Sequence, residues 1–187
     1  MKDYLVGRFL IASPSIRDRR FKRAVILICD HDDTHAMGLV INRAMPQLTL
    51  PTLLDRLGID CALGLPIAPV LDGGPCQRDR GFVLHSDDWE GDESTQAIVH
   101  GLRMTATRDV LQAIAHGNKP NRATLVLGYA GWDAGQLEAE ICDNAWLVAD
   151  ADIEAVFTTT NLDEKWVDAI SRLGLEPWQI SQTAGQA

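Results

Sequence analysis

Residues 124–146 decide the fold, and they read Thr-Leu-Val-Leu-Gly-Tyr-Ala-Gly-Trp-Asp-Ala-Gly-Gln-Leu-Glu-Ala-Glu-Ile-Cys-Asp-Asn-Ala-Trp. The apolar run at 125–127 predicts a short buried strand. A glycine-rich turn is then expected to carry two large rings; its residues are Gly128, Tyr129, Gly131, Trp132, Gly135 and Gln136. Leu137 and Ile141 lie four positions apart, which predicts one face of a short helix before a further strand from Trp146.

This glycine-rich turn is a candidate ligand site, because a strand, a turn and a helix N-terminus together can present backbone N–H groups to an anion. The glycine spacing matches neither GxGxxG nor GxxxxGK[ST], so it indicates no nucleotide site. The favoured interpretation is that the glycines let the chain bend while the two rings pack on the core. A small-molecule site or an enzyme at this turn is the alternative, with Arg43, Arg80 and His85 as its neighbours.

Composition indicates an ordinary globular chain. The 187 residues are 46% hydrophobic and 23% charged, and one domain spanning 1–187 is expected. The longest apolar run covers residues 24–29, which is far too short to span a membrane. The first residues lack the charged-then-apolar order of a signal peptide. We therefore expect a cytoplasmic protein without membrane association.

The net charge of −9 is unevenly distributed. Residues 17–23, the basic loop, hold five bases and one acid, whereas residues 133–168 hold ten acids and one base, Lys165. An acidic chain repels nucleic acid, so direct nucleic-acid binding is disfavoured and would rest on the basic loop alone. Such a loop can also pair with an acidic protein surface. Its candidate contact residues are Arg17, Arg19, Arg20, Lys22 and Arg23.

Motifs for catalysis or metal binding are weak. His31 and His35 stand among three aspartates, but on a turn their spacing lacks the helical geometry of a metal motif, and a solvated polar turn is favoured. Cys76 and His85 could be imagined as nucleophile and base, yet no hydrolase or cysteine-protease signature surrounds them. We therefore nominate no catalytic residue, no metal ligand and no cofactor. An enzyme is disfavoured but stays open.

The four cysteines show no CxxC pair and no zinc spacing, so reduced thiols are expected. Cys29 and Cys142 fall in predicted strand and helix and should be buried, whereas Cys76 should be the most exposed.

The remaining pattern favours an α+β fold, since strands come in clusters rather than alternating with helices. Strands are expected at 9–12, 23–29, 36–42, 69–71, 81–85 and 98–105. Helices are expected at 49–57, 109–116 and 161–173, the last begun by Asn161 and Glu164 as a capping box.

Several longer motifs resemble the YqgE/AlgH family of bacterial cytoplasmic proteins. They are Gly7-Arg-Phe-Leu-Ile-Ala12, Ala36-Met-Gly-Leu-Val-Ile-Asn-Arg43, Gly73-Gly-Pro75, Arg80-Gly-Phe-Val-Leu-His85, and Gly128-Tyr-Ala-Gly-Trp132. Together they cover nearly the whole chain in the family's order. The sequence departs from the family pattern at Ser13, Arg19 and Ala44, and Gln186 stands where the family typically has His.

The resemblance implies an α+β fold with a branched mixed sheet, part of it closing into a small barrel, surrounded by helices. It implies no reaction, cofactor or catalytic residue. The family's label as transcriptional regulators implies a regulatory role. Because the chain is acidic and has no recognisable DNA-binding module, we expect that role to be indirect and its partner to be another protein.

Overall fold

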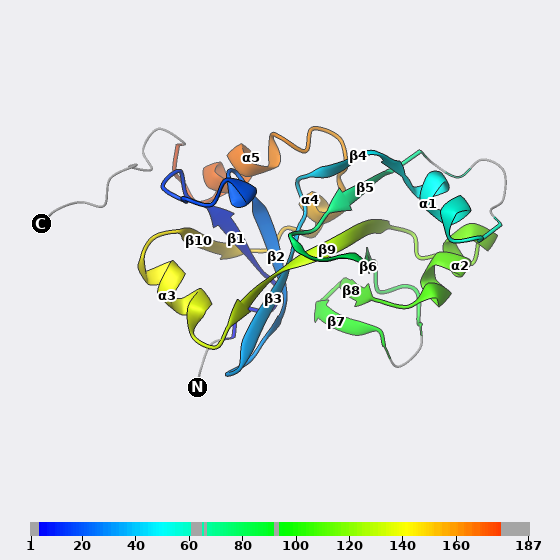
Figure 1. The fold of residues 1–187 in the computed structure, drawn as a ribbon, viewed down its shortest axis with the longest axis horizontal. Coiled ribbons are helices and arrows are strands. Elements are labelled where there is room, and N and C mark those ends of the chain that lie inside the picture. Colours follow the sequence, from blue (N-terminus) through cyan, green and yellow to red (C-terminus); the bar gives the residue numbers. More distant parts are fainter. Residues whose placement is uncertain (1–3, 61–64, 66, 92–93, 177–187) are drawn as a thin grey trace, which may run out of the picture.

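The computed structural model describes residues 4–60, 65, 67–91 and 94–176 (Figure 1). Its strands are β1 (Arg8–Ala12), β2 (Val25–His31), β3 (His35–Val40), β4 (Ala44–Thr49), β5 (Pro69–Asp72), β6 (Cys76–His85), β7 (Gln96–Val99), β8 (Leu102–Thr105), β9 (Ala123–Asp133) and β10 (Trp146–Asp150). Its helices are α1 (Leu50–Arg56), α2 (Arg108–His116), α3 (Gln136–Cys142), α4 (Ile153–Phe157) and α5 (Lys165–Arg172), with a 3-10 turn, η1 (Arg19–Phe21).

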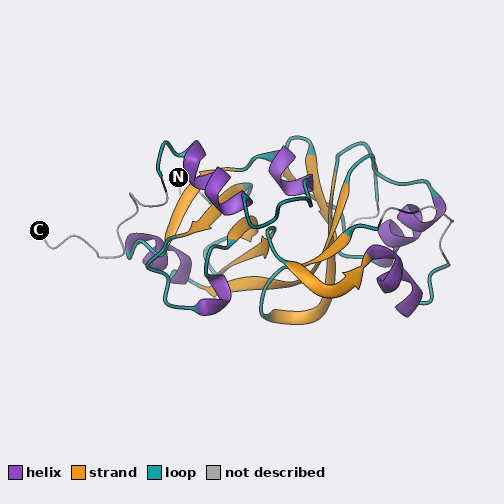
Figure 2. Ribbon diagram, turned by 90° about the horizontal axis from the view of Figure 1, so that it is seen from above, coloured by secondary structure: helices purple, strands orange, loops and turns teal. Residues whose placement is uncertain are grey.

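The ten strands form one mixed sheet that branches. The main path runs β10-β1-β2-β3-β9-β6-β8-β7, with antiparallel neighbours throughout. β5 pairs in parallel with β9 and antiparallel with β4, so β9 is the branch point. The sheet curls, with helices packed around it (Figure 2). The predicted α+β fold with a branched, partly barrel-like sheet is confirmed.

The glycine-rich turn predicted after residue 127 is wrong, because β9 continues to Asp133 as one strand of 11 residues. Gly128 has a φ of +73°, and a Cβ there would lie 2.6 Å from the carbonyl oxygen of Gly74. Glycine at this position therefore permits a bend and a close backbone approach inside a strand. Around this bend β9 changes neighbours: β5 pairs with residues 126 and 127, β6 with residues 123–127 and Tyr129, and β3 with residues 130–133. The turn itself is confined to residues 134 and 135, just before α3.

Side chains on alternate sides of the same strands build separate parts of the core. Phe9 and Ile11 of β1 pack in the cluster that includes Trp166 of α5. Their neighbours Leu10 and Ala12 pack in a second cluster with Trp132 and with residues of α3 and β10. A third cluster joins α1 and α2 to β5, β6 and β9. Side chains alternate between the two faces of a strand, and residues 9–12 of β1 and 25–29 of β2 are all apolar, which explains why these segments are buried on both faces.

Three local expectations need correction. Residues 98–105 form two strands, β7 and β8, because Gly101 with a φ of +84° reverses the chain between them. The last helix begins at Lys165, not at 161, because Asn161 has a φ of +55° and cannot be part of a helix start. β4 was not expected; it contains Pro46 and pairs only with β5 among the described strands, which suits an edge.

Other expectations are confirmed. Residues 23–42 contain the β2–β3 hairpin. α1 and α2 end as predicted, at Gly58 and Gly117 in the left-handed conformation. Within the described residues, no helix is both long and apolar enough to cross a membrane.

Candidate functional site

The basic loop lies within the connection between β1 and β2, and several contacts hold this connection in place. Ser13 donates its backbone N–H to Ala145 across to the neighbouring β10 segment at 2.9 Å. Asp18 begins η1, and its carboxylate accepts the backbone N–H of Arg20 at 2.9 Å. Phe21 packs edge-on against Trp146, with ring centroids 5.7 Å apart. The loop therefore has a defined shape, set by capping and by an aromatic anchor.

Arg43 fixes the far side of this loop. Arg43 lies after β3 in the sequence. Its guanidinium donates to the carbonyl of Lys22 at 2.7 Å and to the carbonyl of Arg20. Arg43 was expected to neighbour the glycine-rich segment. Arg43 instead contacts the basic loop, where the several N–H donors of its guanidinium satisfy two backbone carbonyls.

The bases of the loop are not equally available. Arg20 pairs with Asp18 at 2.7 Å, and this hydrogen-bonded pairing lowers the pKa of the Asp18 carboxyl and raises that of Arg20. The guanidinium of Arg23 lies 5.0 Å from the centroid of the Trp166 ring. Among the five bases of the loop, Arg17, Arg19 and Lys22 are exposed and have no side-chain partner in the described part of the chain. These three charges face solvent on a fixed backbone.

Candidate residues on β9 and at the start of α3 form hydrogen bonds within the protein. The indole of Trp132 is buried and donates to Glu140 at 2.9 Å, and the Trp146 indole donates to the same carboxylate oxygen at 2.7 Å. Gln136 bridges the β9–α3 turn, accepting from the backbone of Asp133 at 3.0 Å and donating to Glu140 at 2.9 Å.

Tyr129 and Gly131 also have structural roles. Tyr129 is partly buried and packs edge-on against Phe82. Gly131 is exposed and pairs with Met37. These contacts agree with the interpretation that the two rings of this segment pack on the core.

The other two proposed neighbours of that segment lie apart from each other. His85 is fully buried at the end of β6; its Nδ1 donates to the carbonyl of Ser86 and its Nε2 accepts from Thr105, both at 2.9 Å. Burial lowers the pKa of His85, so the neutral ring is favoured. Arg80 is exposed and lies over the ring of Phe82 at 5.1 Å. Cys76 begins β6 and His85 ends it. A strand rises about 3.3 Å per residue, so these two side chains are too far apart for proton transfer.

The histidines of the β2–β3 hairpin do not share a site. His31 is buried, accepts the backbone N–H of Leu5 at Nδ1 (3.0 Å) and contacts Glu138 at Nε2 (3.0 Å), so it is not part of a solvated turn as expected. His35 is exposed, and its contact with Asp30 raises its pKa. No group of three or more metal-ligating side chains is present over the described residues.

Two features escaped sequence reasoning. Cys142 was expected to be buried but is exposed at the end of α3, because it lies on the helix face away from Leu137; Cys76 is intermediate and Cys29 is buried. Lys165 was counted only as one base among acids, yet its side chain is buried and donates to the carbonyl of Ile41 at 2.9 Å. Cys61 and Gln186 lie outside the described residues.

The AlgH-like family profile matches residues 9–178. The chain belongs to the AlgH-like family. A UPF0301 protein of Caulobacter vibrioides is 46% identical over 186 residues, covering 99% of this chain and 95% of its own length. A second UPF0301 protein, from Ruegeria pomeroyi, is 47% identical over 184 residues, covering 98% of this chain and 99% of its own length.

Two solved structures share this AlgH-like fold. The solution structure of the AlgH protein from Pseudomonas aeruginosa has a TM-score of 0.77 and 40% identity, covering 100% of this chain and 98% of its own. A crystal structure of a Corynebacterium diphtheriae protein has a TM-score of 0.69 and 22% identity, covering 89% and 85% respectively, and shows the fold alone. The biochemical function of the AlgH-like family is not defined by these likenesses.

Proposed function

We propose that this AlgH-like protein is a non-enzymatic adaptor of the cytoplasm, which acts in regulation by binding an acidic surface of another protein through its basic loop. Any effect on transcription is then indirect. The observation that carries the proposal is the group of three unpaired, exposed bases, Arg17, Arg19 and Lys22, on a loop whose backbone is pinned.

These contacts favour binding, because a loop whose backbone is already fixed loses little conformational entropy when a partner docks. The contacts that hold the loop use backbone groups and the side chains of Asp18, Phe21 and Arg43, so the three free bases are left for a partner. Complementary charge would speed the encounter and fix orientation, with a strong dependence on salt.

A protein partner fits better than nucleic acid. Binding to a phosphate backbone needs several Lys and Arg contacts spread along one face, and this surface offers three unpaired bases on a chain of net charge −9. Duplex DNA and single-stranded RNA, labelled for fluorescence anisotropy, should therefore bind no tighter than about 10⁻⁴ M at physiological salt, the weak end of non-specific affinity. Binding tighter than about 10⁻⁶ M would favour direct nucleic-acid contact instead.

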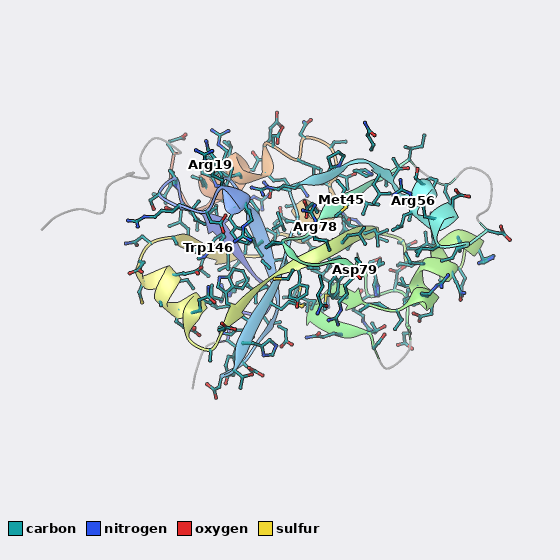
Figure 3. The ribbon with its side chains drawn as sticks, viewed as in Figure 1. Arg19, Met45, Arg56, Arg78, Asp79 and Trp146 are labelled. Carbon is teal, nitrogen blue, oxygen red and sulfur yellow. The ribbon has the colours of Figure 1, made fainter. Side chains whose placement is uncertain are left out.

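The test uses two charge-matched variants at opposite ends of the molecule. Arg17→Ser with Arg19→Ser removes two bases from the loop, whereas Arg56→Ser with Lys119→Ser removes two exposed bases elsewhere; Figure 3 shows Arg19 and Arg56 far apart. Each tagged protein is used to capture proteins from an extract of its own cells, and captured proteins are quantified by mass spectrometry at low and physiological salt.

We expect the loop variant to lose a defined set of proteins that wild type and the control variant both retain. The loss should resemble the effect of added salt on the wild type, because both weaken the same charge contacts. Equal recovery by the two variants would remove the role given to the basic loop.

A further inference from the structure

A cavity of about 260 Å³ lies between α5, the segment around α4, and the β1–β2–β10 part of the sheet. Its floor is apolar, formed by Phe9, Val25, Ile41, Ala149, Ala155 and Ala169. The cavity is at the small end of ligand sites, which commonly measure about 300–1,000 Å³, so an occupant would be a small metabolite. It is separate from the basic loop.

One face of α5 supplies three of the charged groups of this cavity. Lys165, Asp168 and Arg172 are spaced at i, i+3 and i+7, which places them on the same side of the helix. Lys165 is only 6% exposed, and its amine donates to the carbonyl of Ile41 at 2.9 Å. An ammonium has three N–H donors. Within the described residues Ile41 is its one acceptor, so two donors are available to a ligand.

Carboxylates surround the rim of the cavity, and several are already neutralised. Asp152 pairs with Arg172 at 2.6 Å, Glu154 pairs with Arg122, and Asp150 pairs with Arg8. Glu164 and Asp168 are exposed and have no side-chain partner in the described structure. The cavity therefore combines a buried cation below with two free carboxylates at its edge.

We propose that this cavity binds a small zwitterion of the amino-acid type, with its carboxylate on Lys165, its ammonium at Glu164 and Asp168, and a short aliphatic side chain on the apolar floor. A simple anion would satisfy Lys165 but face the rim carboxylates. A simple cation would satisfy the rim but face the buried ammonium. One molecule carrying both charges a few ångströms apart satisfies both.

The environment of Lys165 agrees with this assignment. Desolvation lowers the pKa of its amine to about 8, because burial disfavours the charged form. A ligand carboxylate would favour the ammonium and raise this pKa, so binding should be accompanied by proton uptake near pH 8 and should weaken as the pH rises above it. The charged groups that line the same cavity are the carboxylates of Asp150, Asp152, Glu154, Glu164 and Asp168 and the guanidinium of Arg172. Burial alone lowers the pKa of the Lys165 amine, without a contribution from these groups.

The experiment is titration calorimetry on the full chain at pH 7, with three probes that share the same branched aliphatic group. L-leucine carries both charges, 4-methylpentanoate has only the carboxylate, and 3-methylbutylamine has only the ammonium. We expect leucine to bind and each single-charge analogue to bind at least about tenfold more weakly, because each loses one charge-assisted contact. Amide NMR shifts caused by leucine should map to α5, β10 and the segment around α4.

Variants separate a ligand site from a structural lysine. Lys165→Met should weaken leucine binding by about tenfold or more, and Asp168→Asn, at an exposed position that leaves the core intact, by about threefold. Lys119→Met, which removes an exposed lysine outside this cavity, should change nothing. The proposal is overturned if leucine does not bind, if the analogues bind as well as leucine, or if Asp168→Asn and Lys119→Met behave alike. A lost basic-loop function would alter none of these results.

Discussion

Replacing Lys165 by Met should remove a specific pH dependence from the stability of this AlgH-like protein. The buried amine has a pKa of about 8, against a usual 10.5 in the unfolded chain. Between these two values the unfolded chain binds the proton and the folded chain releases it, so the free energy of unfolding should rise with pH. At about 1.4 kcal/mol per pH unit, this rise amounts to about 3 kcal/mol.

The assay is urea unfolding followed by tryptophan fluorescence at several pH values from 7 to 10.5. Tyrosines, cysteines and other lysines also titrate in this range, so the informative quantity is the difference between wild type and Lys165→Met. That difference should shift by about 3 kcal/mol in favour of the wild type as the pH rises. Met keeps much of the apolar stem volume, and the exposed variant Lys119→Met should run parallel to the wild type. Parallel profiles for wild type and Lys165→Met would refute the reasoning that burial controls this amine.

Three further predictions follow from other contacts. NMR titration should give His35 a pKa above 6.5, and the stability that this residue contributes should be lost as the pH rises through its raised pKa. The same titration should give His85 a pKa below 6.5, and the protein should lose stability as the pH falls below about 6.5. Gly74→Ala should cost about 3 kcal/mol or more in urea unfolding, because a Cβ would lie 2.3 Å from a backbone carbon of β9, whereas Gly131→Ala, with its nearest contact at 3.4 Å, should cost less than about 1 kcal/mol. Glu140→Ala should lower stability by about 2–4 kcal/mol and alter tryptophan emission, because two indole N–H groups lose their acceptor; unchanged emission and stability would count against this.

Much of the fold could be predicted because its strongest signals are local. Apolar runs gave the hairpin of β2 and β3, and glycines after an amphipathic segment marked the ends of α1 and α2. The course of β9 could not be predicted in this way. Glycine is typical of turns, yet Gly128 lies within the sheet, where its backbone closely approaches that of Gly74. Gly74 is more than fifty positions away in the sequence, so no local pattern indicates this contact.

The candidate site shows the same division. The basic loop could be predicted because its charges are adjacent in the sequence. The hydrogen bonds from Arg43 to the loop could not, because they depend on β3 ending beside the loop. Lys165 gave no signal, because its burial depends on the position of α5 over the sheet. Asn161 and Glu164 matched the residue types of a capping box, yet the backbone at Asn161 takes a left-handed conformation, and no local pattern revealed that.

The most direct test of the basic loop as a protein-binding surface is site-specific photocrosslinking in living cells. A benzophenone amino acid is placed at position 17, within the loop, or at position 56, on α1 at the other end of the molecule (Figure 3). Our account predicts a discrete crosslinked product at position 17 that is sensitive to protease, resistant to nuclease and absent at position 56. A nuclease-sensitive product, or the same products at both positions, would contradict it.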